Sequence, residues 1–147
     1  MAYEPKTWRL SDYQAGATKP DALDPQTSGD LWKIWDVARH DSVHCLYAVV
    51  NAGNRTGAHT HPDANHYTVV IKGTALVWIE GTIVRLEEGD IVSIPTGVLH
   101  DFGADTTGEC WVVDLTTPPF DPEKMQFDPS REAEIAEAFQ AAMTPRP

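Results

Sequence analysis

Long hydrophobic runs are missing from this 147-residue sequence: none approaches the roughly 20 apolar residues that cross a bilayer as a helix, so we expect no membrane association. Positive charge is also scarce, because 11 Lys and Arg stand against 22 Asp and Glu, which gives a formal net charge of −11. Nucleic acids and anionic membranes favour clustered Lys and Arg, so we expect neither as a partner. The apolar fraction of 41% is ordinary for a globular protein and excludes global disorder.

Cysteine is nearly absent, and the two that occur, Cys45 and Cys110, each lie inside a short run of strand-forming residues. This pattern predicts two buried, reduced thiols rather than a disulfide framework. The N-terminal residues 1–6 have no apolar segment of the kind found in secretory signals. We therefore expect a cytoplasmic protein.

Sustained helical periodicity is missing before residue 130. From Leu31 onward, short runs rich in β-forming residues are separated by glycines and other turn residues at fairly even intervals. This spacing is typical of an all-β sandwich or barrel and differs from the alternation of strands and helices in βαβ folds. The pair Glu80-Gly81, which lies between two such runs, predicts a tight hairpin turn.

The two ends of the chain differ from this central part. The N-terminal residues carry scattered Pro, Gly and Asp and predict an irregular arm, with Trp8 and Tyr13 as its anchors on the barrel. Near the C-terminus, a helix is expected over Arg131–Met143, with Ser130 as its N-cap. We expect one domain over residues 1–147, made of an arm at about 1–30, a barrel at about 31–117 and an extension with a short helix at about 118–147.

Histidines are concentrated in one short segment. His59 and His61 are two residues apart, so on an extended strand both side chains point to the same face. His66 follows a predicted turn and can return to the same place, and His100 can be brought alongside on a later strand. Burying same-face imidazoles is costly unless each has a partner, and neutral imidazole is the commonest metal ligand in proteins. These four histidines therefore predict a metal site, while we interpret His40 and His44 as exposed or structural.

Two segments resemble the paired sequence motifs of the cupin superfamily. Residues 53–73 match the first motif, which reads G, five residues, H-x-H, three or four residues, E, six residues, G. Residues 89–104 match the second, which reads G, five residues, P-x-G, two residues, H, three residues, N. The spacing agrees at every fixed position. Two residue types depart, since His66 replaces the glutamate of the first motif and Ala104 the asparagine of the second.

The resemblance implies a double-stranded β-helix, the jelly-roll barrel of the cupins, with a metal inside. It carries His59, His61 and His100 over as ligands and places His66 where the family usually has a glutamate ligand. In this respect the chain looks like a small bacterial single-domain cupin with a four-histidine site. The resemblance also implies a homodimer and one divalent transition metal per chain. Nitrogen-only ligation favours Fe, Ni, Cu or Zn, and the family adds Mn.

The surroundings of this metal follow from the alternation of side chains along strands, counted from His66 and His100, and from the positions of large aromatic residues. The expected pocket residues are Tyr47, Thr68, Val70, Trp78, Phe102 and Trp111. Arg55 and Lys33 are interpreted as exposed charges rather than as anion-binding groups. No protein base is assigned, because three carboxylates are near the motifs in sequence only, and a surface or turn position explains each of them: Asp101, Glu109 and Asp114.

Several functions agree with a metal cupin. The favoured hypothesis is a metal-dependent, dioxygenase-like oxidoreductase that binds a small organic substrate beside O₂, with the histidines acting only as ligands. The first alternative is a non-redox lyase, isomerase or cyclase, in which the metal polarises a substrate carbonyl. The second alternative is a non-enzymatic module that holds a small ligand or a metal. The lack of an assigned base favours activation at the metal itself.

Overall fold

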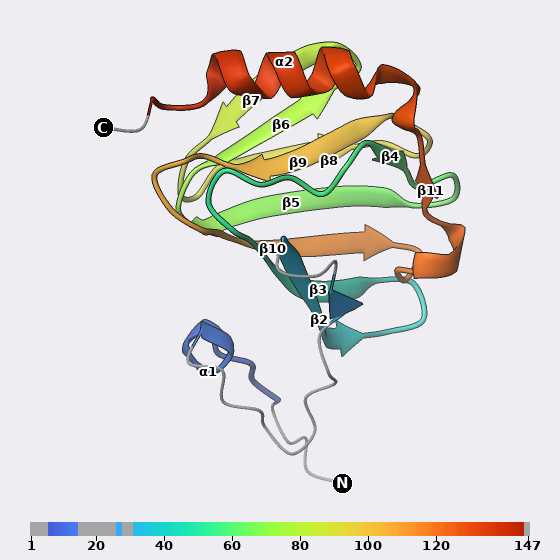
Figure 1. Ribbon diagram of the computed structural model, residues 1–147. Coiled ribbons are helices and arrows are strands. Elements are labelled where there is room, and N and C mark those ends of the chain that lie inside the picture. The colour runs from blue at the N-terminus through green and yellow to red at the C-terminus, as the bar shows by residue number, and fades with distance from the viewer. Residues whose placement is uncertain (1–5, 15–25, 28–30, 146–147) are drawn as a thin grey trace, which may run out of the picture.

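The computed structural model describes residues 6–14, 26–27 and 31–145, and its strands form two antiparallel sheets that face each other (Figure 1). The first sheet has the order β1-β2-β3-β10-β5-β8 and the second the order β11-β4-β9-β6-β7. The first sheet consists of β1 (Gln26–Thr27), β2 (Trp32–Arg39), β3 (His44–Val50), β10 (Cys110–Thr117), β5 (Asn65–Lys72) and β8 (Ile91–Ile94). The second consists of β11 (Gln126–Phe127), β4 (His59–Thr60), β9 (His100–Ala104), β6 (Ala75–Ile79) and β7 (Thr82–Leu86).

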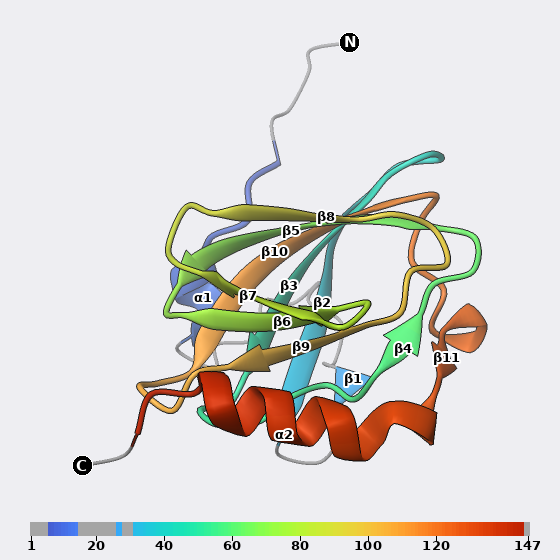
Figure 2. The same cartoon turned by 90° about the horizontal axis from the view of Figure 1, so that it is seen from above.

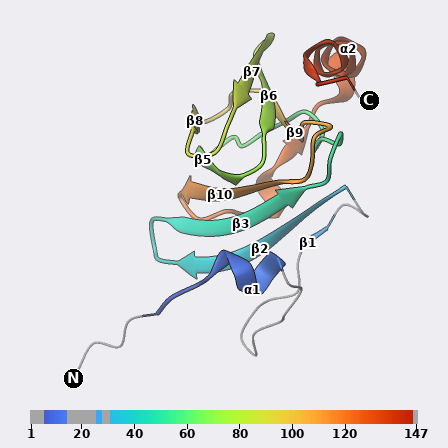
Figure 3. The same ribbon diagram turned by 90° about the vertical axis from the view of Figure 1, so that its left-hand side faces the viewer.

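Neighbouring strands in these sheets are mostly far apart in the sequence. β10 lies between β3 and β5, and β9 lies between β4 and β6, so the chain passes repeatedly from one sheet to the other. Figure 3 shows β2, β3 and β10 on one side of the molecule and β6, β7 and β9 on the other. This connectivity is that of a double-stranded β-helix, or jelly roll, and it confirms the predicted all-β fold.

The hairpin between β6 and β7 confirms the turn expected at Glu80-Gly81. Glu80 has a φ of 45° and Gly81 a φ of 96°, so both central residues have the positive φ of a type I′ turn. Glycine adopts this conformation without steric cost, which is why the turn can join the two strands directly.

Within the described residues, two helices and two short 3-10 turns lie outside the sheets: α1 (Leu10–Gln14), α2 (Glu132–Ala142), Pro122–Lys124 and Pro129–Arg131. α2 confirms the helix expected near the C-terminus, but its start differs from the prediction. Ser130 does not cap α2: the N-cap residue of this helix is Arg131, which makes no side-chain capping hydrogen bond. Asp128 instead caps the 3-10 turn Pro129–Arg131 that leads into α2, because its carboxylate accepts a hydrogen bond from the Ser130 N–H. No helix in the described part of the chain is long and apolar enough to cross a membrane.

The outer face of the second sheet is covered by α2, which packs on β6 and β7 (Figures 1 and 2). Ile135 and Phe139 are buried under the helix and pack against Leu76 and Trp78 on β6. Arg131 places its guanidinium carbon 4.7 Å from the centroid of the Trp78 ring. The apolar side of the helix and the outward side of β6 therefore bury each other.

The outer face of the first sheet is covered by α1 at the opposite end of the molecule (Figure 1). Tyr13 is buried there, and its ring centroid lies 4.9 Å from that of Tyr47. Trp8 and Trp111 belong to the same cluster. Trp8 and Tyr13 thus anchor the arm as expected, while most of the remaining arm lies outside the described residues.

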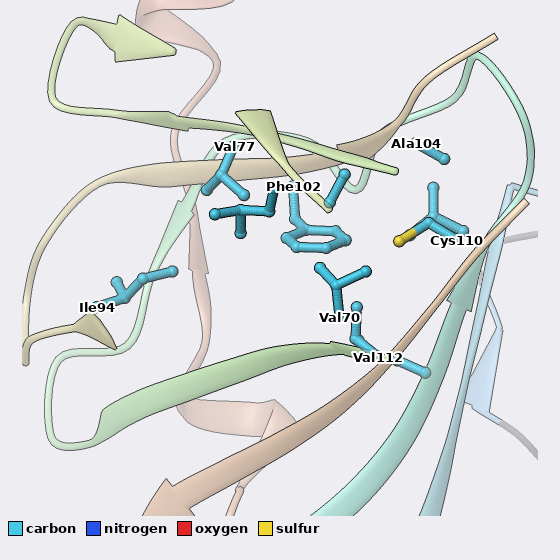
Figure 4. Close-up of a cluster of buried hydrophobic side chains, with 11 residues drawn as sticks. Val70, Val77, Ile94, Phe102, Ala104, Cys110 and Val112 are labelled. Carbon is cyan, nitrogen blue, oxygen red and sulfur yellow. The ribbon is translucent and has the colours of Figure 1, made fainter. Parts of the chain in front are cut away.

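One half of the barrel interior is filled by apolar side chains that are aliphatic or small apart from Phe102, and we call it the aliphatic end (Figure 4). Val70 and Val77 face each other from the two sheets, and both are fully buried. Cys110 is buried among them, where desolvation raises the pKa of its thiol to about 12. The aliphatic end consists of Ala48, Val50, Val70, Ala75, Val77, Leu86, Ile94, Phe102, Ala104, Cys110 and Val112.

Candidate metal centre

Three imidazoles meet at the other half of the barrel interior. His59 on β4 is paired in register with His100 on β9, and His61 follows His59 on the same face of the chain. One nitrogen atom of each ring lies within 4.8 Å of the other two, a spacing that fits a single metal ion. The H-x-H pattern and the pairing of β4 with β9 therefore bring together the three histidines that the motifs indicated.

Backbone carbonyls orient two of these rings. The Nδ1 atom of His59 lies 2.7 Å from the carbonyl oxygen of Gly57, and the Nδ1 atom of His100 lies 2.9 Å from that of Val98. A carbonyl oxygen can only accept, so each Nδ1 carries the proton and each Nε2 keeps a free lone pair. This is the arrangement found around bound metals, where the second ring nitrogen of a ligand is fixed by an outer partner.

His66 lies beside this cluster on β5. Its ring stacks on that of His61, with 3.8 Å between the ring centroids and 26° between the planes. Its Nε2 atom is buried and has no hydrogen-bond partner. The structure thus gathers three histidines at one point and places the fourth in contact with them, with one polar atom still unsatisfied.

All four imidazoles are held in the neutral form. Burial, together with the smaller effect of the neighbouring imidazoles, lowers the pKa of His61 to about 2, that of His100 to about 3 and that of His66 to about 4. Burial also lowers the pKa of His59. Since metal binding requires deprotonated imidazole, these rings can accept a divalent ion at neutral pH without losing a proton. The donor set therefore fits a transition metal.

A pocket of about 700 Å³, counted with its opening to solvent, adjoins the histidines. Its walls are mostly apolar and come from β2, β3 and β10 of the first sheet and from the segment that follows β10. All four histidines line it, together with Thr68 and Phe102, which were expected there. Mostly apolar walls with a few polar groups are characteristic of sites that bind small organic molecules.

Four other expected pocket residues are placed elsewhere. Val70 belongs to the aliphatic end, one inward-facing position further along β5 than Thr68. Tyr47 and Trp111 lie on the outer face of the first sheet under α1, and Trp78 lies on the outer face of the second sheet under α2. The predicted aromatic wall is therefore wrong for Tyr47, Trp78 and Trp111, while Phe102 lines the pocket as expected. The other aromatic residues that line the pocket are Trp32, Phe120 and Phe127. Aromatic side chains cover the outside of both sheets because helices pack there.

One lining residue was not recognised in the sequence as a pocket group. Asp114 on β10 lies opposite Thr68 on β5, and the Thr68 hydroxyl donates a hydrogen bond of 2.5 Å to the Asp114 Oδ1 atom. Desolvation raises the pKa of this carboxyl group to about 6, although the hydrogen bond from Thr68 lowers it. The signal available in the sequence was the alternation along β10, where Asp114 shares a face with the buried Val112.

The segment after β10 closes the histidine end of the barrel. The ring of Phe120 lies edge-on to those of His61 and His66, with centroid distances of 5.9 and 6.3 Å. The Phe120 backbone N–H donates a 3.2 Å hydrogen bond to the Nδ1 atom of His44, which is buried. His44 therefore has a structural role, which was one of the two roles expected for it. It fixes the backbone of Phe120, whose ring packs over the histidines.

Comparisons with known proteins agree with this fold. Residues 46–116 match the model of the cupin domain family. A structure of KdgF from Halomonas sp. is 24% identical with a TM-score of 0.63, and the alignment covers 69% of this chain and 91% of that one. A double-stranded β-helix protein from Klebsiella pneumoniae is 17% identical with a TM-score of 0.66, over 84% and 97% of the two chains. A cupin-like protein from Thermotoga maritima is 22% identical with a TM-score of 0.61, over 82% and 93%.

No curated protein matches the sequence. The chain is thus similar to the cupin domain over residues 46–116, and the structural neighbours support a jelly-roll fold. Identities below 25% carry information about the fold alone, so the function must be argued from the site.

Proposed function

We propose that this chain, a jelly-roll barrel that matches the cupin domain over residues 46–116, is a metal-dependent enzyme acting on a small organic substrate. The observation that carries the proposal is the position of Asp114. Among the described residues that line the pocket, it is the only carboxylic acid, and it shares that pocket with the histidine cluster. A metal-binding group and a proton-transfer group can therefore reach the same bound molecule.

The histidines His59, His61 and His100 would hold one divalent metal, with His66 as a fourth ligand. The unpartnered Nε2 atom of His66 supports this role, because a buried polar atom without a hydrogen bond is costly unless it has a ligand. Four neutral donors leave the full charge of the ion in place. When bound, such a metal supplies a Lewis acid that polarises a substrate oxygen, and the nitrogen donors favour Fe, Ni, Cu or Zn, with Mn added by the resemblance.

Asp114 then acts as the acid or base. The hydroxyl of Thr68 occupies Oδ1 and holds the carboxyl group in one orientation, which leaves Oδ2 for a substrate proton. A pKa of about 6 lets the group both take and return a proton near neutral pH. This arrangement favours the lyase, isomerase or cyclase alternative, in which a proton is removed next to a polarised carbonyl.

The dioxygenase-like oxidoreductase remains the second candidate, and the nitrogen-only donor set favours it because such sites suit redox-active Fe and Cu. It differs from the first in its need for O₂. Under this alternative, Asp114 only positions the substrate. Turnover that stops under anaerobic conditions and survives in Asp114→Asn would select it.

The first experiment is a proton-exchange assay on untagged protein loaded separately with Fe(II), Mn(II), Ni(II), Cu(II) or Zn(II). A panel of small ketones, keto acids and ketoses is incubated in D₂O, and proton NMR follows the loss of the C–H signal next to the carbonyl. We expect exchange with the wild type and none with Asp114→Asn at unchanged metal content. Oxygen uptake is recorded with the same panel. Metal binding without exchange or oxygen uptake would support the non-enzymatic binding module instead.

We also propose that the protein is cytoplasmic, as expected from its N-terminal sequence, and that it is a homodimer, as the resemblance to cupins implies. Tyr67 and Ile91 support a dimer, because they are 42% and 64% exposed on the adjacent strands β5 and β8. A second copy can cover such an apolar surface. Sedimentation of the wild type and of Ile91→Ser tests this, with a dimer expected to weaken in the variant. A monomeric wild type would contradict it.

A further inference from the structure

We infer that Asp101 and Arg55 are positioning residues for His59 and that Glu132 links them to the first turn of α2. This inference rests on the proposed metal site. It means that a buried network of charged side chains outside the pocket orients one of the metal ligands, His59. Asp101 lies next to His100 on β9, but its side chain is on the outer face of the second sheet and is fully buried.

The network is a continuous set of charged contacts. The Arg55 Nη1 atom donates to the Asp101 Oδ2 atom at 2.5 Å, and the Arg55 Nη2 atom donates to a carboxylate oxygen of Glu132. Arg55 is mostly buried, and its guanidinium also lies 5.5 Å from the centroid of the Phe139 ring. The guanidinium is thus held between the barrel wall and α2.

The other oxygen of Asp101 leads to the metal ligand. Asp101 Oδ1 accepts a 3.1 Å hydrogen bond from the Gly57 N–H, while the Gly57 carbonyl accepts the 2.7 Å hydrogen bond from His59 Nδ1. Gly57 has a φ of 92°, which glycine adopts readily and other residues rarely do. Both backbone polar groups of Gly57 are therefore fixed: its N–H by Asp101 and its carbonyl by the imidazole of His59.

Fold stability alone does not account for this network. Asp101 is fully buried, and a buried ion pair is weak evidence for stability because removing its charges from water is costly. What the network supplies is the direction of the Gly57 carbonyl. That carbonyl keeps the proton of His59 on Nδ1 and its Nε2 toward the other imidazoles.

A matched control lies at the opposite end of the same helix. Asp105 is also fully buried, and it pairs with Arg85 and accepts hydrogen bonds from the backbone and hydroxyl of Thr144, just after α2. The two aspartates thus tether the two ends of α2 to the barrel. Of the two, only Asp101 is hydrogen-bonded to the segment that orients a histidine of the cluster.

The test compares Asp101→Asn and Arg55→Met with Asp105→Asn and Arg85→Met in the full chain. Affinity is measured by titration with Zn(II), and the ring nitrogens of His59 in the metal-free protein are observed by ¹⁵N NMR. We expect roughly 10- to 100-fold weaker Zn(II) binding in the first pair, as for other partners of metal ligands, together with a changed tautomer population at His59. The control pair should keep wild-type affinity and tautomer, whatever their loss of thermal stability.

Glu132→Gln, an exposed and milder change, should weaken Zn(II) binding by less than Asp101→Asn. Equal loss of affinity in both pairs, in proportion to their loss of stability, would overturn the inference and leave a purely structural network. An unchanged His59 tautomer in Asp101→Asn would also overturn it. If the wild type bound no Zn(II), the proposed function would fail separately, because the NMR comparison needs no metal.

Discussion

The two ends of the barrel interior use the same strands for opposite purposes. β5 contributes His66 and Thr68 to the histidine end and Val70 to the aliphatic end. β10 contributes Asp114 to the first and Cys110 to the second. The change from polar to apolar takes place within one or two inward-facing positions, so the site is built directly on the core that supports it.

The difference lies in how well each end satisfies its own atoms. The aliphatic end consists of buried residues whose side chains carry no nitrogen or oxygen atom. At the histidine end, the Nε2 atom of His66 and the hydroxyl of Thr116 are buried without partners. Such atoms reduce stability, since each has lost its hydrogen bonds to water. The aliphatic end therefore contributes mainly to the stability of the fold, and the histidine end supplies the groups that can bind a metal and transfer a proton. Substitutions at one end should affect stability, and substitutions at the other should affect metal binding.

The largest expected effect is the loss of metal binding in His61→Ala. Structural zinc sites gain about 10–16 kcal/mol from about four ligands, so removing one should weaken binding by roughly 100- to 1,000-fold. Zn(II) titration measures this, and His40→Ala is the control because His40 is exposed. Similar affinity in the two variants would show that the histidine end is not a metal site.

The converse substitution is Leu86→Ala at the aliphatic end. Leu86 is only 6% exposed, and its truncation should lower the free energy of unfolding by about 2–3 kcal/mol, within the usual range for a buried leucine. Urea denaturation of the metal-free protein measures the loss. Zn(II) affinity should stay within about twofold of the wild type. A large loss of affinity would mean that the two ends are coupled.

A smaller effect is expected from His66→Ala. As a fourth ligand stacked on His61, His66 should contribute about tenfold to Zn(II) affinity, which corresponds to about 1.4 kcal/mol. The variant should also destabilise the metal-free protein less than Leu86→Ala does. The loss of packing around the ring is partly offset because the unpartnered buried nitrogen is removed. Unchanged Zn(II) affinity would restrict the ligand set to the three clustered histidines.

The sequence was informative where spacing decides the geometry. His59 and His61 share a face because they are two residues apart, and His100 follows a Pro-x-Gly turn, so their meeting could be predicted without coordinates. The pocket walls could not be predicted in the same way. β3 and β10 carry apolar residues on both faces, because α1 buries the outer face, so hydrophobicity did not distinguish the inside at Asp114 from the outside at Tyr47.

The last prediction concerns the cost of Asp114 to the fold. Its pKa of about 6 lies above the ordinary 3.8, so the folded state holds this proton more tightly than the unfolded state does. Below about pH 4 the carboxyl group is protonated in both states and does not reduce the free energy of unfolding. Above about pH 6 it is ionised in both states, and the full cost of burying the charge reduces the free energy of unfolding. Asp114→Asn should therefore raise the stability of the metal-free protein at pH 8 by about 3 kcal/mol, the free energy that corresponds to a shift of about two pKa units.

Urea denaturation of both proteins at pH 8 and at pH 4 measures this difference, which should nearly vanish at the lower pH. Asp105→Asn is the control with the opposite sign: hydrogen bonds from Thr144 and Thr106 and from Arg85 hold the pKa of Asp105 at about 2, against the opposing effect of burial. That carboxylate stabilises the fold above about pH 4, so its loss should destabilise at pH 8. A destabilising Asp114→Asn would place Asp114 among the supporting residues. In that case ionised Asp114 would not reduce the stability of the fold, and this argument for a functional role at the histidine end would be lost.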